Sequence, residues 1–158
     1  MSHLFDALRL RDVTFANRIG VSPMCQYSCT DGFANDWHFV HLATRAVGGA
    51  GLVFTEAAAV TPEGRISPQD LGVWSEKHFE PLERITRFID EQGAVAGIQL
   101  AHAGRKASTY RPWSGSGKVP ESEGGWQAVG PTTAAFSPDY PVPAELTVAQ
   151  IAGLQTAF

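Results

Sequence analysis

Residues 52–57 form an almost continuously apolar run, Leu52-Val53-Phe54-Thr55-Glu56-Ala57. Such a run is typical of a strand in a parallel sheet whose two faces are both covered. A second run, Arg18–Ser22, precedes it and is closed by Pro23, and a third, Val95–Leu100, follows it. We therefore expect three buried strands, with residues 52–57 second in chain order.

Helical patterns separate these strands. Asn35 or Asp36 is a suitable N-cap for a helix over residues 37–47, which the glycines at 48 and 49 would end. Ser75 is a suitable N-cap for a second helix, which carries an apolar stripe and ends at Gly93. Alternation of strand and helix is the pattern of a parallel α/β sheet.

Shorter elements are expected outside this core. Leu8–Leu10 and Val13–Phe15 predict a small hairpin, and residues 61–72 predict a loop. Residues 101–146 hold six of the ten prolines, yet they also contain aromatic residues that a disordered linker would lack. We interpret them as a long loop over a functional site, with a hairpin at Trp126–Val129.

The last helix is expected to begin after Thr147, a suitable N-cap, and to cover residues 148–158. Its final turn has no glycine, proline or basic residue, which are the usual signals of a helix end. This pattern predicts that the chain is a piece of a longer sequence.

Composition excludes several functional classes. The 158 residues suit one domain, and a formal charge of −4 leaves no basic excess for nucleic acid. No run of eighteen apolar residues predicts a membrane span. Two cysteines cannot build a disulfide framework, so we expect a reducing, cytoplasmic compartment. The motifs of a P-loop, a dinucleotide-binding turn after a strand and a nucleophile elbow are absent from the sequence.

Residues with chemical potential follow the predicted strands. Ligands of parallel α/β folds bind at the carboxyl ends of the strands. The first strand is followed by Ser22-Pro23-Met24-Cys25-Gln26-Tyr27, and the second ends with Glu56 and the small residue Ala57. Gln99 lies inside the third strand, where a buried amide would need hydrogen-bond partners on both its donor and acceptor sides. Together they predict a site for a flat ligand.

Each of these residues also has a structural interpretation. Cys25 is as easily an inert core residue, and Tyr27 a packed ring. The basic residues His102, Arg105 and Lys106 form either an anion site or, more simply, a solvated turn.

A zinc site is a rival interpretation of the N-terminal third. Its four ligands would be Cys25, Cys29, His38 and His41, which are of the residue types that bind zinc. Their spacing is shorter than in the common zinc finger, and the surrounding chain has enough apolar residues to fold without a metal. We therefore predict no metal.

Several longer stretches together resemble one known family, the Old Yellow Enzyme family of FMN-dependent ene-reductases. They cover essentially the whole chain in order: Asn17-Arg18-Ile19, Pro23-Met24-Cys25-Gln26-Tyr27, Asn35-Asp36-Trp37-His38, Gly48-Gly49-Ala50-Gly51-Leu52, Pro62-Glu63-Gly64-Arg65, Gly97-Ile98-Gln99-Leu100-Ala101-His102-Ala103-Gly104-Arg105-Lys106 and Arg111-Pro112-Trp113. The cysteine at position 25 is similar to that of a bacterial subgroup that includes xenobiotic reductase A.

The resemblance implies a TIM (β/α)8 barrel. Residues 1–158 would be the N-terminal part of a single FMN-binding barrel domain, with about three of its β/α units. Within it, residues 1–16 would be the N-terminal hairpin segment that closes the bottom of the barrel, and residues 101–146 the long loop over the site.

The resemblance also implies roles for individual residues. Cys25 would lie near the reactive edge of the flavin and tune its potential, and Tyr27 would help to hold the carbonyl oxygen of the substrate. Ala57 would let the ring approach, and Gln99 would hydrogen-bond its pyrimidine edge. The full set of implied FMN contacts is Ser22, Pro23, Met24, Cys25, Ala57 and Gln99.

The implied activity is that of an NADPH dehydrogenase. NADPH or NADH would reduce the flavin, which would then reduce activated C=C bonds of small enones. The family's further substrate-binding, proton-donating and phosphate-binding residues would lie beyond residue 158, and the complete protein would be a homo-oligomer. The alternative is a non-catalytic fragment that needs the rest of the barrel, in cis or in trans, to fold and bind FMN.

Overall fold

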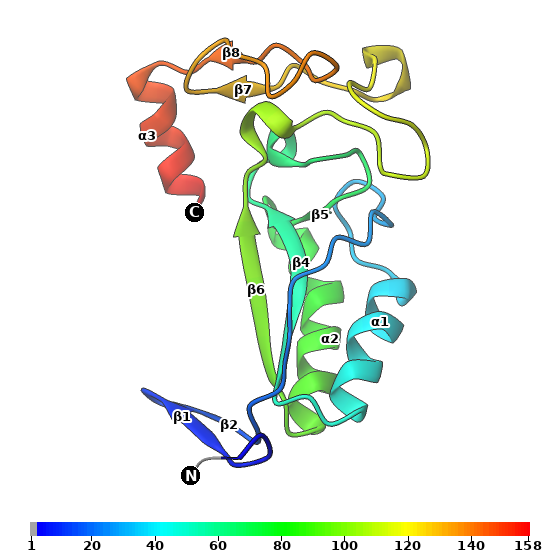
Figure 1. Ribbon diagram of the computed structural model, residues 1–158, viewed down its shortest axis with the longest axis vertical. Helices are drawn as coiled ribbons and strands as arrows, with labels where there is room; N and C mark the ends of the chain where they lie inside the picture. The colour runs from blue at the N-terminus through cyan, green and yellow to red at the C-terminus, as the bar shows by residue number, and fades with distance from the viewer. Residues whose placement is uncertain (1–2) are drawn as a thin grey trace.

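A four-stranded parallel sheet forms the centre of the computed structural model, which describes residues 3–158 (Figure 1). Its longest strand, β4 (Leu52–Ala59), pairs along its length with β6 (Val95–Ala101). The beginning of β4 pairs with β3 (Gly20–Val21), and its end pairs with β5 (Leu71–Gly72). The three expected strands are confirmed, although β3 is shorter than expected and β5 lies in a segment expected to be a loop.

Two helices cover one side of this sheet (Figure 1). Helix α1 (Asp36–Val47) begins with Asn35, whose side chain accepts a hydrogen bond from the backbone of the first turn. Helix α2 (Phe79–Glu91) follows a 3-10 turn that Ser75 caps. The expected cap at Asn35 is confirmed, because capping depends on residues adjacent in the chain. The expectation that Ser75 caps the second helix itself is wrong, since the N-cap of α2 is His78, which makes no side-chain cap hydrogen bond.

The hydrophobic core lies between the helices and the sheet. Its most buried side chains come from β4, from the segment after it and from α2, and they include Val53, Leu71, Ile85 and Ile89. The helices also contact each other through the rings of Phe39 and Phe88, whose centroids are 5.2 Å apart. Burial of these side chains is the main force that holds the helices on the sheet.

The predicted N-terminal hairpin is present. Strands β1 (Leu8–Leu10) and β2 (Val13–Phe15) pair antiparallel. Figure 1 shows them at the end of the molecule where β4 and β6 begin, opposite the carboxyl ends of those strands. Met1 and Ser2, the first residues of the expected segment 1–16, lie outside the described residues.

Residues 101–146 pass over the carboxyl ends of β4 and β6 (Figure 1). The prediction of a hairpin at Trp126–Val129 is wrong. Strand β7 (Val129–Gly130) instead pairs parallel with β8 (Ala144–Glu145). Trp126 is held elsewhere, since its backbone N–H donates to Ser108 Oγ and its indole N–H to the carbonyl oxygen of Glu63. These contacts are distant in sequence, so no local pattern predicts them.

One face of the molecule is less buried than expected. Ile98, Gln99 and Leu100 of β6 are exposed, which contradicts the expectation of a fully buried strand. Helix α3 (Val148–Ala157), capped by Thr147 as expected, has no buried residue. No other element of residues 3–158 covers these side chains. Within that same range, no helix has the length and apolar character needed to cross a membrane.

Candidate functional site

The pairing of β4 with β6 brings two of the expected site residues together. Ala57 and Gln99 are direct partners in the register of the two strands. Beyond them, toward the carboxyl ends, lies a cavity of about 80 Å3. Its lining consists mostly of small side chains and includes Ala57, Ala59, Gly64, Ile66, Asp70, Ala101, His102 and Ala103. Ala57 contributes only a methyl group to this lining, and its proposed role beside a ring remains a prediction.

Gln99 differs from the expectation in its burial. The residue is exposed, and its amide makes no hydrogen bond to any of residues 3–158. Its apolar neighbours in the sequence predicted a buried strand, but no other element of the described chain covers this part of β6. Both the donor and the acceptor of the amide are therefore available to a ligand.

The loop after β3 holds the next four expected residues. Ser22 and Met24 are exposed, whereas Pro23 and Cys25 are half-buried. Burial is the main reason that the pKa of Cys25 lies above its ordinary value; the charges of two buried carboxylates, on Asp70 and Glu56, act in the same direction. Cys25 is consequently a neutral thiol near neutral pH.

Tyr27 lies beside Cys25 and has a left-handed backbone conformation, with a φ of 49°. Residues other than glycine rarely adopt it, and such strain is concentrated at functional sites. Burial first, and then the neighbouring Cys25 and Asp70, raise the pKa of Tyr27 to about 12. Its phenol therefore keeps its proton near neutral pH and can donate a hydrogen bond.

The long loop contacts this part of the site. The ring of Trp113 meets that of Tyr27 edge-on, with centroids 5.8 Å apart. The Arg111 guanidinium donates a hydrogen bond of 3.3 Å to the backbone oxygen of Tyr27. Two residues of the segment 101–146 thus contact Tyr27, and the role of this segment as a loop over the site remains a prediction.

Glu56 fixes the position of the same loop. Its Oε2 accepts a hydrogen bond of 2.9 Å from the backbone N–H of Gln26, which lies between Cys25 and Tyr27. Glu56 is only 3% exposed. From the sequence this residue was placed at a strand end with no role assigned to it. The signal for one was a carboxylate inside an apolar run, because a buried charge requires a partner.

The basic residues after β6 fit the simpler of their two interpretations. Arg105 and Lys106 are exposed, and the Lys106 ammonium lies 4.1 Å from the centre of the Phe136 ring. His102 lines the cavity, and burial lowers its pKa, so its imidazole is neutral. These residues form a solvated basic turn with one neutral histidine facing the site.

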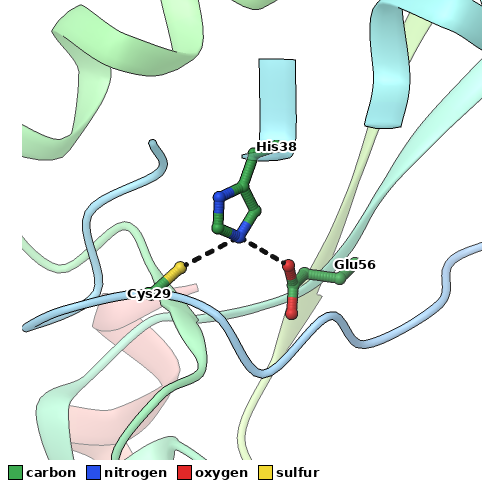
Figure 2. Close-up of side chains that lie close together, drawn as sticks. All are labelled: Cys29, His38 and Glu56. Atoms are coloured by element: carbon green, nitrogen blue, oxygen red, sulfur yellow. Dashed lines mark hydrogen bonds and ion pairs between the residues drawn. The ribbon is translucent and has the colours of Figure 1, made fainter. Parts of the chain in front are cut away.

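Cys29, His38 and Glu56 meet in the interior (Figure 2). His38 Nε2 is 3.3 Å from Cys29 Sγ and 3.1 Å from Glu56 Oε1. Burial, reinforced by the charges of Glu56 and Asp70, raises the pKa of the Cys29 thiol well above its ordinary value. Among residues 3–158, this group does not include Cys25 or His41, so the four-ligand zinc set considered from the sequence is wrong.

Comparison with known proteins shows which family this chain matches. Residues 3–158 match the NADH:flavin oxidoreductase / NADH oxidase family. An NADH:flavin oxidoreductase from Gibberella zeae is 45% identical over 159 residues, covering 98% of this chain and 38% of the relative. An NADPH dehydrogenase from a Geobacillus species is 43% identical over 157 residues, covering 98% of this chain and 42% of the relative. The chain therefore spans about two fifths of the length of these relatives.

Solved structures show the same arrangement of elements. The old yellow enzyme homologue from Zymomonas mobilis superposes with a TM-score of 0.80 at 26% identity, covering 99% of this chain and 43% of that one. This similarity confirms the expected fold class, the N-terminal part of a TIM barrel, and the resemblance to Old Yellow Enzymes.

Proposed function

The chain belongs to the NADH:flavin oxidoreductase / NADH oxidase family, and we propose that the protein is an FMN-dependent ene-reductase that uses NADPH or NADH. The observation that carries this proposal is the register of Ala57 with Gln99, beside the loop that holds Cys25 and Tyr27. It gathers a small residue, an amide, a thiol and a phenol at the carboxyl ends of parallel strands, where TIM barrels bind their ligands.

The residues present fit a flavin. Gln99 offers an unpaired donor and acceptor, as the pyrimidine edge of the ring requires. Ala57 borders the cavity with a side chain of one methyl group, and Cys25 is a neutral thiol. We propose that these three residues hold FMN together with Ser22, Pro23 and Met24. The chemistry that FMN supplies when bound is hydride transfer from NAD(P)H to an activated C=C bond.

The protein's own residues position and polarise the substrate. Tyr27 keeps its phenolic proton near neutral pH and donates it in a hydrogen bond to the carbonyl oxygen of an enone. Glu56 holds the Gln26 backbone and so fixes Tyr27 next to Cys25. Trp113 and Arg111 pack over Tyr27 and reduce the access of water.

The alternative, a non-catalytic fragment that needs further chain, is supported by the exposed face of β6 and by α3. Ile98 and Leu100 are 43% and 44% exposed, and α3 buries none of its residues. Isolated parallel sheets rarely leave such a face uncovered. On this alternative, residues 1–158 alone are non-catalytic and require further chain, in cis or in trans, to bind FMN. The two free cysteines favour a reducing, cytoplasmic compartment.

The cofactor and the activity can be tested separately on the full-length protein. Denaturation should release one flavin, identified by chromatography as FMN; FAD, or no flavin, would contradict the proposed site. Anaerobic mixing of the reduced enzyme with a small cyclic enone should then reoxidise the flavin and yield the saturated ketone. Reoxidation by oxygen alone, with no enone reduced, would leave a flavin oxidase and refute the ene-reductase assignment.

A further inference from the structure

Three different elements contribute to the buried group in Figure 2. Cys29 lies in the loop after β3, His38 in the first turn of α1, and Glu56 in β4. Their exposed fractions are 4%, 2% and 3%. One ligand atom from each residue lies within 4.8 Å of the others, a thiol sulfur, an imidazole nitrogen and a carboxylate oxygen. The proposed flavin chemistry uses none of these three atoms.

Direct hydrogen bonds do not satisfy all three atoms. A neutral imidazole nitrogen has one N–H or one lone pair, directed in the plane of the ring. His38 Nε2 therefore bonds well to only one of its two neighbours, and its hydrogen bond is with Cys29 Sγ. Glu56 Oε1 is near enough to form an ion pair but has no hydrogen-bond partner. A buried carboxylate oxygen in this state is costly unless something else compensates it.

Two of the three distances between these atoms are close to those between the ligands of a tetrahedral metal ion. Zinc bonds of about 2.0 Å to nitrogen and oxygen and about 2.3 Å to sulfur place neighbouring ligand atoms roughly 3.3–3.5 Å apart. The observed separations from His38 Nε2, 3.3 Å to Sγ and 3.1 Å to Oε1, are close to those values. The third separation, between Cys29 Sγ and Glu56 Oε1, is within 4.8 Å.

The surroundings supply the contacts that support metal ligands. In the metal-free protein His38 Nδ1 accepts a 3.1 Å hydrogen bond from the Asn35 backbone N–H, so Nε2 carries the ring proton. Metal binding at Nε2 requires the other tautomer, whose Nδ1–H can donate to Asn35 Oδ1, 3.0 Å away. Glu56 Oε2 is held by the Gln26 backbone N–H. A cavity of about 10 Å3 borders His38 and Glu56. Such a space is close to the roughly 10–15 Å3 that one water molecule needs.

We propose that Cys29, His38 and Glu56 bind a divalent cation of the zinc type in a tetrahedral site, with water as the fourth ligand. A thiolate and a carboxylate balance the two positive charges, so the buried site is neutral when loaded. The Cys29 thiol proton is released to solvent on binding. The ion ties α1, β4 and the Gln26 loop together, a structural role that does not depend on the flavin.

The test measures metal content and ligand type in the full-length protein, purified after growth with zinc. Elemental analysis compares the parent protein with Cys29→Ala and with Cys25→Ala, a control that removes the chain's other cysteine. We expect about one zinc per chain in the parent and the control, and less than about a tenth of that in Cys29→Ala. Thermal melting of each variant checks that it is folded.

X-ray absorption at the zinc edge identifies the ligands without interference from flavin. The parent should show one sulfur neighbour at about 2.3 Å and three nitrogen or oxygen neighbours at about 2.0 Å. Protein that holds no zinc after growth and reconstitution would overturn the proposal, as would bound zinc without a sulfur neighbour. If Cys29→Ala does not fold, the spectrum of the parent protein alone decides.

Discussion

Asn17 is expected to contribute more to stability than its half-buried position suggests. Its Nδ2 donates a 2.8 Å hydrogen bond to the carbonyl oxygen of Gly49, and its Oδ1 accepts 3.0 Å bonds from the N–H groups of Ile19 and Gly51. These bonds connect the segment before β3 to the turn between α1 and β4. Asn17→Ala removes all three.

The magnitude follows from the three bonds. Each contributes roughly 0.5–1.5 kcal/mol net, and partial replacement by water lowers the sum, so we expect Asn17→Ala to cost about 2–3 kcal/mol. Asn17→Asp keeps the two acceptor contacts, but it loses the donor and turns a carboxylate oxygen toward the Gly49 carbonyl oxygen, so it should also be destabilising, by about 1–3 kcal/mol. The chain at Gly51 lies so close to Asn17 that a Cβ there would be 2.7 Å from the Asn17 backbone oxygen.

Urea unfolding of the full-length protein, followed by circular dichroism, measures these differences. The midpoint should be lower in both variants than in the parent, with an unchanged dependence on urea concentration. The reasoning is refuted if Asn17→Ala lies within about 0.5 kcal/mol of the parent, the range of ordinary surface substitutions.

Four further outcomes are expected. Gln99→Leu should weaken FMN binding by about 1–3 kcal/mol, measured as a flavin dissociation constant, because the flavin edge loses its amide partner. Cys25→Ala should shift the flavin potential while FMN stays bound; an unchanged potential and unchanged half-reaction rates would contradict the tuning role. Burial raises the pKa of Asp70 to about 6 from 3.8, so its contribution to stability is full below pH 3.8 and is lost as the pH rises through 6. The free energy of unfolding of the parent should therefore fall by an amount on the order of 3 kcal/mol between those pH values, and Asp70→Asn should lack this fall, as unfolding curves at each pH would show. Residues 1–158 expressed alone should aggregate or fold only partly and be rescued by the remaining barrel strands in trans; a soluble, flavin-loaded monomer would disprove this.

The local signals in the sequence predicted most of the framework. Asn35 and Thr147 cap helices as expected, since a cap depends on residues within one turn. The apolar runs at 52–57 and 95–100 became paired parallel strands. The resemblance in several motifs identified the family, which the match over residues 3–158 confirms. The proposed roles of Cys25 and Tyr27 remain predictions.

Contacts between distant residues decided the rest. The short strand β5 and the parallel pairing of β7 with β8 depend on partners far along the chain, so neither has a local signature. The exposure of Gln99 was missed because an apolar strand pattern does not reveal which faces other elements cover.

The meeting of Cys29, His38 and Glu56 shows the same limit most clearly. The sequence by itself suggested a set of four zinc ligands, favoured no metal, and gave no reason to group Glu56 with Cys29 and His38. Only the packing of α1 against β4 brought a carboxylate from the sheet to the histidine. Residue type determines which chemistry is available, whereas the distances between its atoms are determined by the packing of elements that are remote in sequence.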